Sequence, residues 1–499
     1  MRMVKITSGK FELFYKQVAL FIVLPALFVA SCTSPRHLGR TAVPGRFLDD
    51  PAISDTHTGI AIYDAETREY IYTHNAEKFF IPASNTKIAT LYAGLKYLGG
   101  YIPGIHYLDH NDTLFLIPTG DPTFMLHDFP DQPVLDFMQN ACKPLVFVEP
   151  VWQTGALGYG WPWNFYLNYY MPERSPFPVY GNVVIWAQRD IGDYGEDVRI
   201  TYASSHPVHS WPVEVLESPD LRFKVHRPLN ENVYSVYLGF EGEKDLFVPF
   251  ATGGMEAALE LLADTLDKDI VVVPARPGLP GRAKAGRAGV EGVEVPVPGV
   301  EMPVPGAEMP PAQDGVALTE PGHLRTIVSG VSDTLFRMMM VHSDNFFAEQ
   351  VLIMVSNELF GVMDEMQVIE YLMDNDLAGM PGRPRWVDGS GLSRYNLFSP
   401  RSFVWILEKM KDEFGFGRVS HLLPTGGEGT LDNLYLEESG RIFAKTGTLG
   451  GNAVALSGFL VTEKGRTLIF SVLVNNHNKD SNDVRRATEK FLREIIYRY

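Results

Sequence analysis

The feature that most constrains this chain is a set of three short polar motifs that stand far apart in a fixed order. The first is "SNTK", where Ser84 and Lys87 are three residues apart, directly before an apolar run with helical spacing. At that spacing both side chains lie on one face of a helix, near the positive end of its dipole. "SDN" begins at Ser343 and "KTGT" begins at Lys445. Ser84 and Lys87 are therefore a candidate nucleophile and base, provided that burial lowers the lysine pKa.

Each motif alone has a structural explanation. A serine and a lysine at this spacing are expected about once by chance in a chain of this length. The "SDN" stretch can be a helix cap, and the "KTGT" stretch can be a hairpin turn. The three motifs in this order, each in plausible local structure, together form the signature of serine enzymes that react with penicillin.

Composition favours a globular protein with more than one lobe. The chain has 499 residues, of which 45% are hydrophobic and 12% aromatic, and a single core rarely accommodates that length. The formal charge of −17 argues against a nucleic-acid surface, so no nucleic-acid partner is expected. The sequence has no dinucleotide-binding glycine fingerprint, no Walker loop and no paired CxxC motifs, so it carries no nucleotide or zinc signature.

Residues 1–31 have the pattern of a lipoprotein signal peptide. Basic residues precede "VALFIVLPALFVA", which is too short to span a bilayer comfortably, and "VASC" places small residues directly before Cys32. We expect Cys32 to become the lipidated first residue of the mature chain and residues 32–50 to form a tether; an ordinary signal peptide with a chance cysteine is the alternative. The chain would then be exported, anchored to a membrane through its lipid and facing the periplasm. Thr33 after the cysteine favours the outer membrane.

Along the rest of the chain the predicted secondary structure changes character twice. Residues 58–75 alternate around a turn and predict a hairpin, and the run after Ser84 predicts a helix. Short strand-like runs then predict a β-rich insertion, which includes an amphipathic helix over 253–269 and a low-complexity loop over 274–315 that we interpret as a mobile linker. After residue 318 we expect two helices that meet near Ser343, then a strand, a hairpin and a terminal helix. The predicted catalytic domain is thus split into an N-terminal segment (50–105) and a C-terminal segment (318–499) by the insertion (106–317).

The motifs resemble those of the D-alanyl-D-alanine carboxypeptidase/endopeptidase class of low-molecular-mass penicillin-binding proteins, the group with a large insertion in the catalytic domain. The resemblance covers most of residues 55–480. Ser84 and Ser343 are 259 positions apart, whereas class A β-lactamases have a much shorter gap. The resemblance implies an α/β (α+β) catalytic domain of the serine penicillin-recognising, transpeptidase/β-lactamase-like fold. Besides the three motifs it rests on "GDPTF" (120–124), "GYGWPWN" (158–164), "SDNFFAEQ" (343–350), "DGSGLSRYN" (388–396), "GGEGTL" (426–431) and "VNN" (474–476).

The resemblance also implies a role for each motif residue. Ser84 would attack the carbonyl of the penultimate D-alanine, Lys87 would accept the Ser84 proton, and Ser343 would relay a proton to the leaving amine. The backbone N–H groups of Ser84 and Thr448 would form the oxyanion hole. No metal ion and no other cofactor is implied. The implied substrate-binding residues are Asn345 for the peptide amide, and Lys445, Thr446, Gly447 and Thr448 for the terminal carboxylate.

The implied function is a serine-type D-Ala-D-Ala carboxypeptidase that acts on peptidoglycan stem peptides. DD-endopeptidase activity is left open, and β-lactams are the expected inhibitors, because they mimic acyl-D-Ala-D-Ala and would acylate Ser84. One alternative is a β-lactamase or a D-amino-acid esterase or peptidase on the same scaffold. Another is a non-catalytic cell-wall-binding protein, against which the intact Ser84, Lys87 and Ser343 argue.

Some residues near the motifs carry expectations of their own. Phe165 follows "WPWN", where members of this class often carry an acidic residue, and an apolar side chain there cannot pair with an ammonium group of the stem peptide. We interpret Trp161 and Trp163 as packing residues. Cys142 has apolar neighbours, which predicts packing rather than catalysis. The "DGSGLS" stretch (388–393) lacks the first glycine of a nucleophile elbow and predicts a turn beside the active site.

Overall fold

The computed structural model describes residues 43–194, 197–205, 210–274 and 324–499, and the chain divides into two compact units, residues 1–49 and 50–499. The described residues of the first unit contain the short helix α2 (Val43–Leu48). The predicted signal peptide, Cys32, most of the tether and almost all of the low-complexity loop lie outside the described residues. Among the helices of the described residues, none combines the length and apolar character needed to cross a bilayer.

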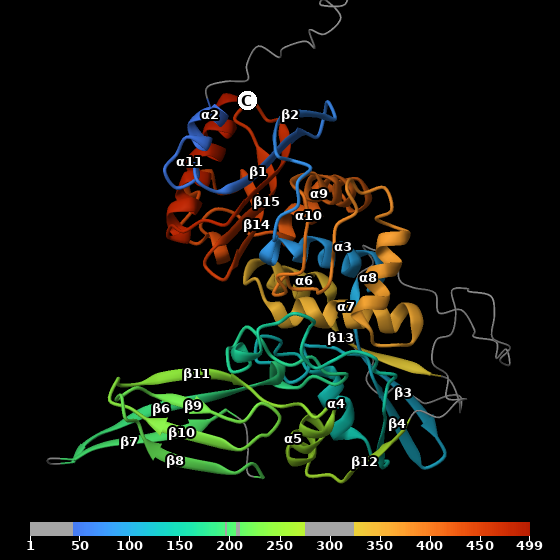
Figure 1. The fold of residues 1–499 in the computed structure, drawn as a ribbon. Coiled ribbons are helices and arrows are strands. Elements are labelled where there is room, and N and C mark those ends of the chain that lie inside the picture. The colour runs from blue at the N-terminus through green and yellow to red at the C-terminus, as the bar shows by residue number, and fades with distance from the viewer. Residues whose placement is uncertain (1–42, 195–196, 206–209, 275–323) are drawn as a thin grey trace, which may run out of the picture. The chain divides into compact units, whose positions relative to one another are not determined.

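The catalytic region is built on a sheet of five antiparallel strands in the order β14-β15-β16-β1-β2 (Figure 1). Strands β1 and β2 form the predicted N-terminal hairpin, and β14, β15 and β16 form the predicted C-terminal strand and hairpin. Most residues of β1, β15 and β16 are buried, which is typical of strands with both faces covered. The strands are β1 (His57–Asp64), β2 (Glu69–His74), β14 (Ile442–Leu449), β15 (Ala453–Val461) and β16 (Thr467–Asn475).

Helices cover both faces of this sheet. Side chains alternate along a strand, so Val454 and Leu456 of β15 face away from Phe459. Phe459 belongs to the large core that holds α9 against β1 and β16, whereas Val454 and Leu456 face the terminal helix α11. The helices are α3 (Lys87–Tyr97), α6 (Ser332–Val341), α7 (Asn345–Phe360), α8 (Glu365–Asp374), α9 (Pro400–Phe414), α10 (Phe416–Leu422) and α11 (Ser481–Arg498). The helices α6 and α7 confirm the prediction of two helices that meet near Ser343.

The insertion is rich in strands, as predicted, and has a hydrophobic core of its own. A five-stranded sheet runs in the order β12-β5-β4-β3-β13, and two three-stranded sheets run in the orders β8-β10-β9 and β11-β6-β7. Helix α5 confirms the predicted amphipathic helix. The elements are β3 (Tyr101–His110), β4 (Thr113–Pro118), α4 (Pro133–Asn140), β5 (Leu145–Val148), β6 (Val183–Tyr194), β7 (Asp197–Ser204), β8 (Val213–Glu217), β9 (Lys224–His226), β10 (Tyr234–Leu238), β11 (Lys244–Pro249), α5 (Glu256–Leu266), β12 (Ile270–Val273) and β13 (Arg325–Val331).

The insertion leaves and re-enters the catalytic region through two paired strands. β3 follows α3 and pairs antiparallel with β13, which leads directly into α6. The expectation that the chain is helical from residue 318 onward is therefore wrong for β13, because pairing with a strand far away in sequence decides its conformation. The predicted boundary between residues 105 and 106 falls inside β3, and the domain division as a whole stays a prediction.

Candidate active site

Ser84 lies in a single 3₁₀ turn, η1 (Ala83–Thr86), that leads into α3. The turn is fixed to β14, because Asn85 Nδ2 donates to the Lys445 carbonyl at 2.9 Å. β14 passes so close that a Cβ on Gly447 would lie 2.8 Å from the Pro82 oxygen and 3.0 Å from the Ser84 nitrogen. Only glycine at that position lets the strand backbone approach the Ser84 N–H this closely.

Lys87 is fully buried and holds three hydrogen bonds. Its Nζ donates to Ser84 Oγ at 3.0 Å, to Asn345 Oδ1 at 2.6 Å and to the Ser390 carbonyl at 2.8 Å. Burial lowers the pKa of Lys87 to about 8, although the negative charges of Asp344, Asp388 and Glu349 oppose the shift. Lys87 is therefore a buried amine that can exchange a proton with Ser84 near neutral pH.

The second motif occupies the junction between α6 and α7. Ser343 has a φ of 59°, in the left-handed region, and Asp344 caps α7 by accepting from the Phe347 N–H at 2.9 Å. Asn345 begins α7 and bridges two regions of the chain: it accepts from Lys87 and donates from Nδ2 to the Tyr170 carbonyl at 2.8 Å. The cap and the bridge hold this junction against α3.

The third motif lies on β14 with alternating side chains. Lys445 is fully buried and donates to the Thr446 carbonyl at 2.9 Å, and burial together with the charge of Lys87 lowers its pKa well below the usual range. The hydroxyl of Thr446 bonds to Thr430 Oγ1 at 2.7 Å, and the hydroxyl of Thr448 accepts from Arg485 at 2.7 Å. These bonds fix both threonine hydroxyls, but only Thr448 lines the cavity beside Ser84, whereas Thr446 lines a separate small cavity.

A cavity of about 1620 Å³ opens beside Ser84. Ser84, Ser343, Asn345 and Thr448 line it together, so the structure brings the three motifs to one place. The buried Lys87, Lys445 and Gly447 lie behind this lining. The insertion contributes aromatic side chains to the wall, namely Phe165, Tyr169 and Tyr170.

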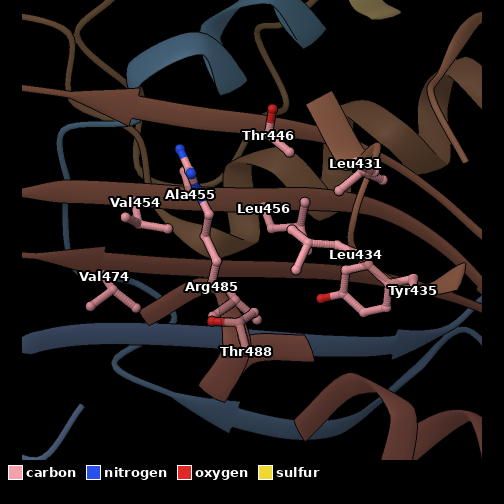
Figure 2. Close-up of a pocket in the computed structure, with 11 residues that line it drawn as sticks. Leu431, Leu434, Tyr435, Thr446, Val454, Ala455, Leu456, Val474, Arg485 and Thr488 are labelled. Carbon is pink, nitrogen blue, oxygen red and sulfur yellow. The ribbon is translucent and has the colours of Figure 1, made fainter. Parts of the chain in front are cut away.

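A second cavity lies on the other side of β14, between the sheet and α11 (Figure 2). Its volume of about 20 Å³ has room for one water molecule and not for a substrate. Thr446, Tyr435 and Arg485 line it, and the buried Tyr435 hydroxyl has no hydrogen-bond partner among the described residues. This cavity is separate from the Ser84 site.

Several groups of the site were not identified from the sequence. The carbonyls of Ser390 and Tyr170 are backbone atoms, and the sequence motifs gave no role to Thr430 or Arg485. The turn over "DGSGLS" was expected beside the active site, and the Ser390 contact with Lys87 confirms it. The glycine-rich "GGEGTL" carries Thr430, so glycines near the motifs were the available signal.

Two packing predictions are wrong. The Trp163 side chain is 74% exposed, and Cys142 is an exposed free cysteine, because apolar sequence neighbours do not determine which way a loop side chain faces. Trp161 does pack, and its Nε1 donates to Asp388 Oδ2 at 3.1 Å. Phe165 meets Tyr170 edge to face, with ring centroids 6.2 Å apart.

Comparison with known proteins gives a consistent result. The family model for D-Ala-D-Ala carboxypeptidase 3 (S13) matches residues 42–219 and 325–495. The chain is 25% identical over 485 residues to the D-alanyl-D-alanine carboxypeptidase of Actinomadura sp. (strain R39), covering 86% of this chain and 80% of that protein. It is 31% identical over 107 residues to the penicillin-sensitive carboxypeptidase A of Dictyostelium discoideum, a match that spans only 20% of either protein.

The solved structures show the same fold. Penicillin binding protein 4 (dacB) from Haemophilus influenzae superposes with a TM-score of 0.68 at 19% identity, covering 92% of this chain and 100% of that chain. The same protein complexed with a β-lactam gives a TM-score of 0.61 at 16% identity, covering 91% and 100%. This likeness confirms the predicted fold class.

Proposed function

The chain belongs to the D-Ala-D-Ala carboxypeptidase 3 (S13) family, as the motifs predicted, and we propose that it is a serine-type D-Ala-D-Ala carboxypeptidase acting on peptidoglycan stem peptides. The observation that carries the proposal is the 3.0 Å contact between Ser84 Oγ and the Nζ of the buried Lys87. A neutral Lys87 accepts the hydroxyl proton as Ser84 Oγ bonds to the carbonyl carbon of the penultimate D-alanine. The backbone N–H groups of Ser84 and Thr448 stabilise the oxyanion.

The other motif residues complete the proposed cycle. Ser343 passes the proton from Lys87 to the leaving amine as the peptide C–N bond breaks and D-alanine departs. Water then cleaves the Ser84 ester, which returns the proton to Oγ and releases the shortened peptide. Lys445, Thr446, Gly447 and Thr448 bind the terminal carboxylate, and Asn345 bonds to the peptide amide through the second proton of Nδ2. Binding of that carboxylate also gives a reason for the buried lysine on β14, because a bound anion would stabilise its charged form.

A β-lactam acylates Ser84 in the same way as the peptide, as expected for a relative of proteins named for penicillin sensitivity and penicillin binding. The chain is exported, and lipid on Cys32 anchors it facing the periplasm, in the outer membrane. DD-endopeptidase activity is the same chemistry on a cross-linked peptide and is left to the assay below.

We expect the full chain to release D-alanine from an acylated D-Ala-D-Ala peptide, and benzylpenicillin to block that release. Intact-protein mass spectrometry should show one penicillin adduct per chain at the same time. Incubation with a cross-linked stem-peptide dimer would reveal endopeptidase cleavage. Consumption of benzylpenicillin without release of D-alanine would indicate a β-lactamase instead. A chain that neither releases D-alanine nor reacts with penicillin would be a non-catalytic wall-binding protein.

The buried Lys87 also predicts how acylation depends on pH. Its pKa is lowered from 10.5 to about 8, so the rate constant for acylation by benzylpenicillin should rise with pH through a midpoint near 8. Below that midpoint Lys87 is protonated and cannot accept the Ser84 proton; at pH 7 only about one molecule in ten is competent. Quenched-flow mass spectrometry from pH 5.5 to 9.5 measures this profile. A midpoint near the ordinary lysine value would contradict Lys87 as the base.

A further inference from the structure

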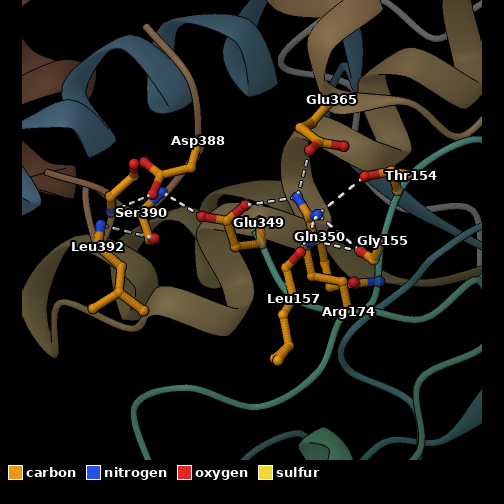
Figure 3. A network of polar contacts seen from close by, with 12 residues as sticks. Thr154, Gly155, Leu157, Arg174, Glu349, Gln350, Glu365, Asp388, Ser390 and Leu392 are labelled. Atoms are coloured by element: carbon orange, nitrogen blue, oxygen red, sulfur yellow. Dashed lines mark hydrogen bonds and ion pairs between the residues drawn. The ribbon is translucent and has the colours of Figure 1, made fainter. Parts of the chain in front are cut away.

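Four buried charged side chains, three carboxylates and one guanidinium, belong to one network of polar contacts (Figure 3). Arg174 is 1% exposed, and its Nη1 lies 2.9 Å from Glu365 Oε1 and 3.4 Å from Glu349 Oε2. Glu349 and Asp388 are fully buried. None of the four lines the cavity beside Ser84. The proposed mechanism therefore gives this cluster no role.

The cluster is nevertheless connected to the nucleophile by short contacts. Glu349 Oε1 accepts from the Ser390 N–H at 2.8 Å, and the Ser390 carbonyl accepts from Lys87 Nζ at 2.8 Å. Lys87 in turn donates to Ser84 at 3.0 Å. An unbroken series of polar contacts thus runs from Arg174 through Glu349, Ser390 and Lys87 to Ser84.

The Ser390 turn occupies a space that leaves it little freedom. A Cβ on Gly391 would lie 1.9 Å from the Ala83 carbonyl, next to the nucleophile, and a Cβ on Gly389 would lie 2.5 Å from the Ala348 carbonyl in α7. Asp388 fixes the same turn by accepting from the Gly391 N–H at 2.8 Å. The turn is thus held between η1 and α7, and Glu349 is the side chain that bonds to the N–H of Ser390, the residue whose carbonyl faces Lys87.

The insertion supplies the side chains that support this turn from the outside. Arg174 and Trp161 both belong to the insertion, since they stand between β3 and β13 in the sequence. The Trp161 side chain donates a hydrogen bond to Asp388. Arg174 is itself fixed by the Gly155 carbonyl at 2.8 Å and by Thr154 Oγ1 at 3.0 Å. An arginine with this many partners is pre-ordered to orient a carboxylate.

We propose that Arg174 and Glu349 are positioning residues for the acylation step, holding the Ser390 carbonyl at Lys87 Nζ so that the amine faces Ser84. The insertion that carries Arg174 is then a structural component of the active site. This inference rests on the proposed function. Arg174 of the insertion thereby influences the orientation of Lys87 in the catalytic region.

The electrostatic consequence follows from the groups that face Lys87. Asp344 at the N-cap of α7, Asp388 of the turn and Glu349 of α7 raise its pKa, and the buried amine of Lys445 on β14 is the basic group beside it. Burial and the neighbouring Asp388 raise the pKa of Glu349 itself to about 7, while Arg174 opposes that shift. A neutral Glu349 removes a negative charge from beside Lys87 and so lowers the Lys87 pKa. Loss of Arg174 raises the pKa of Glu349, which favours neutral Glu349 and therefore also lowers the Lys87 pKa.

The test compares the full chain with Glu349→Gln, Glu349→Leu and Arg174→Gln, using benzylpenicillin as the probe. Glutamine keeps an acceptor oxygen for the Ser390 N–H, so the maximal acylation rate of Glu349→Gln should lie within about threefold of the wild type. The ascending limb of its pH profile, where the acylation rate rises with pH, should lie roughly 0.5–1 pH unit lower. Leucine has no acceptor, so acylation should fall roughly 10- to 100-fold at every pH. Arg174→Gln should shift the limb in the same direction as Glu349→Gln.

The control is Glu173→Gln. Glu173 is a buried carboxylate that also accepts from a backbone N–H, that of Thr252 at 2.8 Å, but it makes no contact with the Ser390 turn. The Glu173→Gln variant should have a lower melting temperature but an unchanged acylation rate and an unchanged pH midpoint.

Unchanged kinetics in Glu349→Leu and Arg174→Gln, with lower melting temperatures alone, would make the cluster purely structural. If Glu349→Leu does not fold, an unmoved pH limb in Glu349→Gln overturns the inference. A wild-type chain that is not acylated refutes the proposed function first, and this inference with it.

Discussion

Replacement of Ser84 by alanine should abolish both D-alanine release and formation of the penicillin adduct. Loss of the nucleophile in a serine hydrolase lowers turnover by roughly 10⁴- to 10⁶-fold. The Lys87 amine is 3.0 Å from Ser84 Oγ, and no other hydroxyl accepts a hydrogen bond from it among the described residues. Rates of D-alanine release and the intact mass after benzylpenicillin treatment measure the effect.

The matched control for that variant is Ser54→Ala, because Ser54 is exposed and does not line the cavity. It should retain full activity. Ser84 itself is only partly buried, so its replacement should leave the melting temperature within a few degrees of the wild type. A folded Ser84→Ala chain that still forms the adduct would place the nucleophile elsewhere, and Ser343, which also lines the cavity, would be replaced next.

The motif residues of the candidate site could be singled out from the sequence because the motifs are short and follow a fixed order. Helical spacing alone left Ser84 and Lys87 a chance match, and it was the motifs beginning at Ser343 and Lys445, in their expected order, that made the pair a candidate site. The helix that follows the second motif was predicted from its apolar run, and α7 confirms it. The hairpin of β1 and β2 was predictable from alternation around a turn. The helix and the hairpin each lie within one short continuous stretch, where propensity and periodicity are informative, whereas the link between the three motifs rests on their order along the chain.

The sequence could not reveal contacts that depend on distant pairing or on backbone atoms. β13 carries β-branched residues, but its strand conformation depends on β3, more than 200 positions earlier. The Ser390 and Tyr170 carbonyls have no side-chain signature, although each bonds to a motif residue. Arg174 is a single charged residue in a long insertion, and only its burial beside Glu349 distinguishes it.

Replacement of Lys87 by methionine should lower acylation by roughly 10³-fold while Ser84 remains in place. A positioned general base contributes about 10²- to 10⁴-fold, and methionine has similar length but cannot accept a proton. Lys87→Arg should lose as much, because a guanidinium stays protonated at every working pH. The measurement is the second-order rate constant of acylation by benzylpenicillin, with the pH profile as a second readout: the limb near pH 8 should disappear in both variants.

The same helix supplies the control, since Lys96 lies in the last turn of α3 and pairs with Glu413 at the surface. Lys96→Met removes the same charge from α3 but breaks only the surface ion pairs of Lys96 with Glu413 and Asp376, so activity should be unchanged and stability should change by less than about 1 kcal/mol. Folding of Lys87→Met is checked by its melting temperature, because Asn345 Oδ1 and the Ser390 carbonyl lose a donor. A folded Lys87→Met chain with wild-type acylation would show that a group other than Lys87 deprotonates Ser84. The buried amine would then serve to bind Asn345 and Ser390, and the positioning role of Glu349 would lose its target.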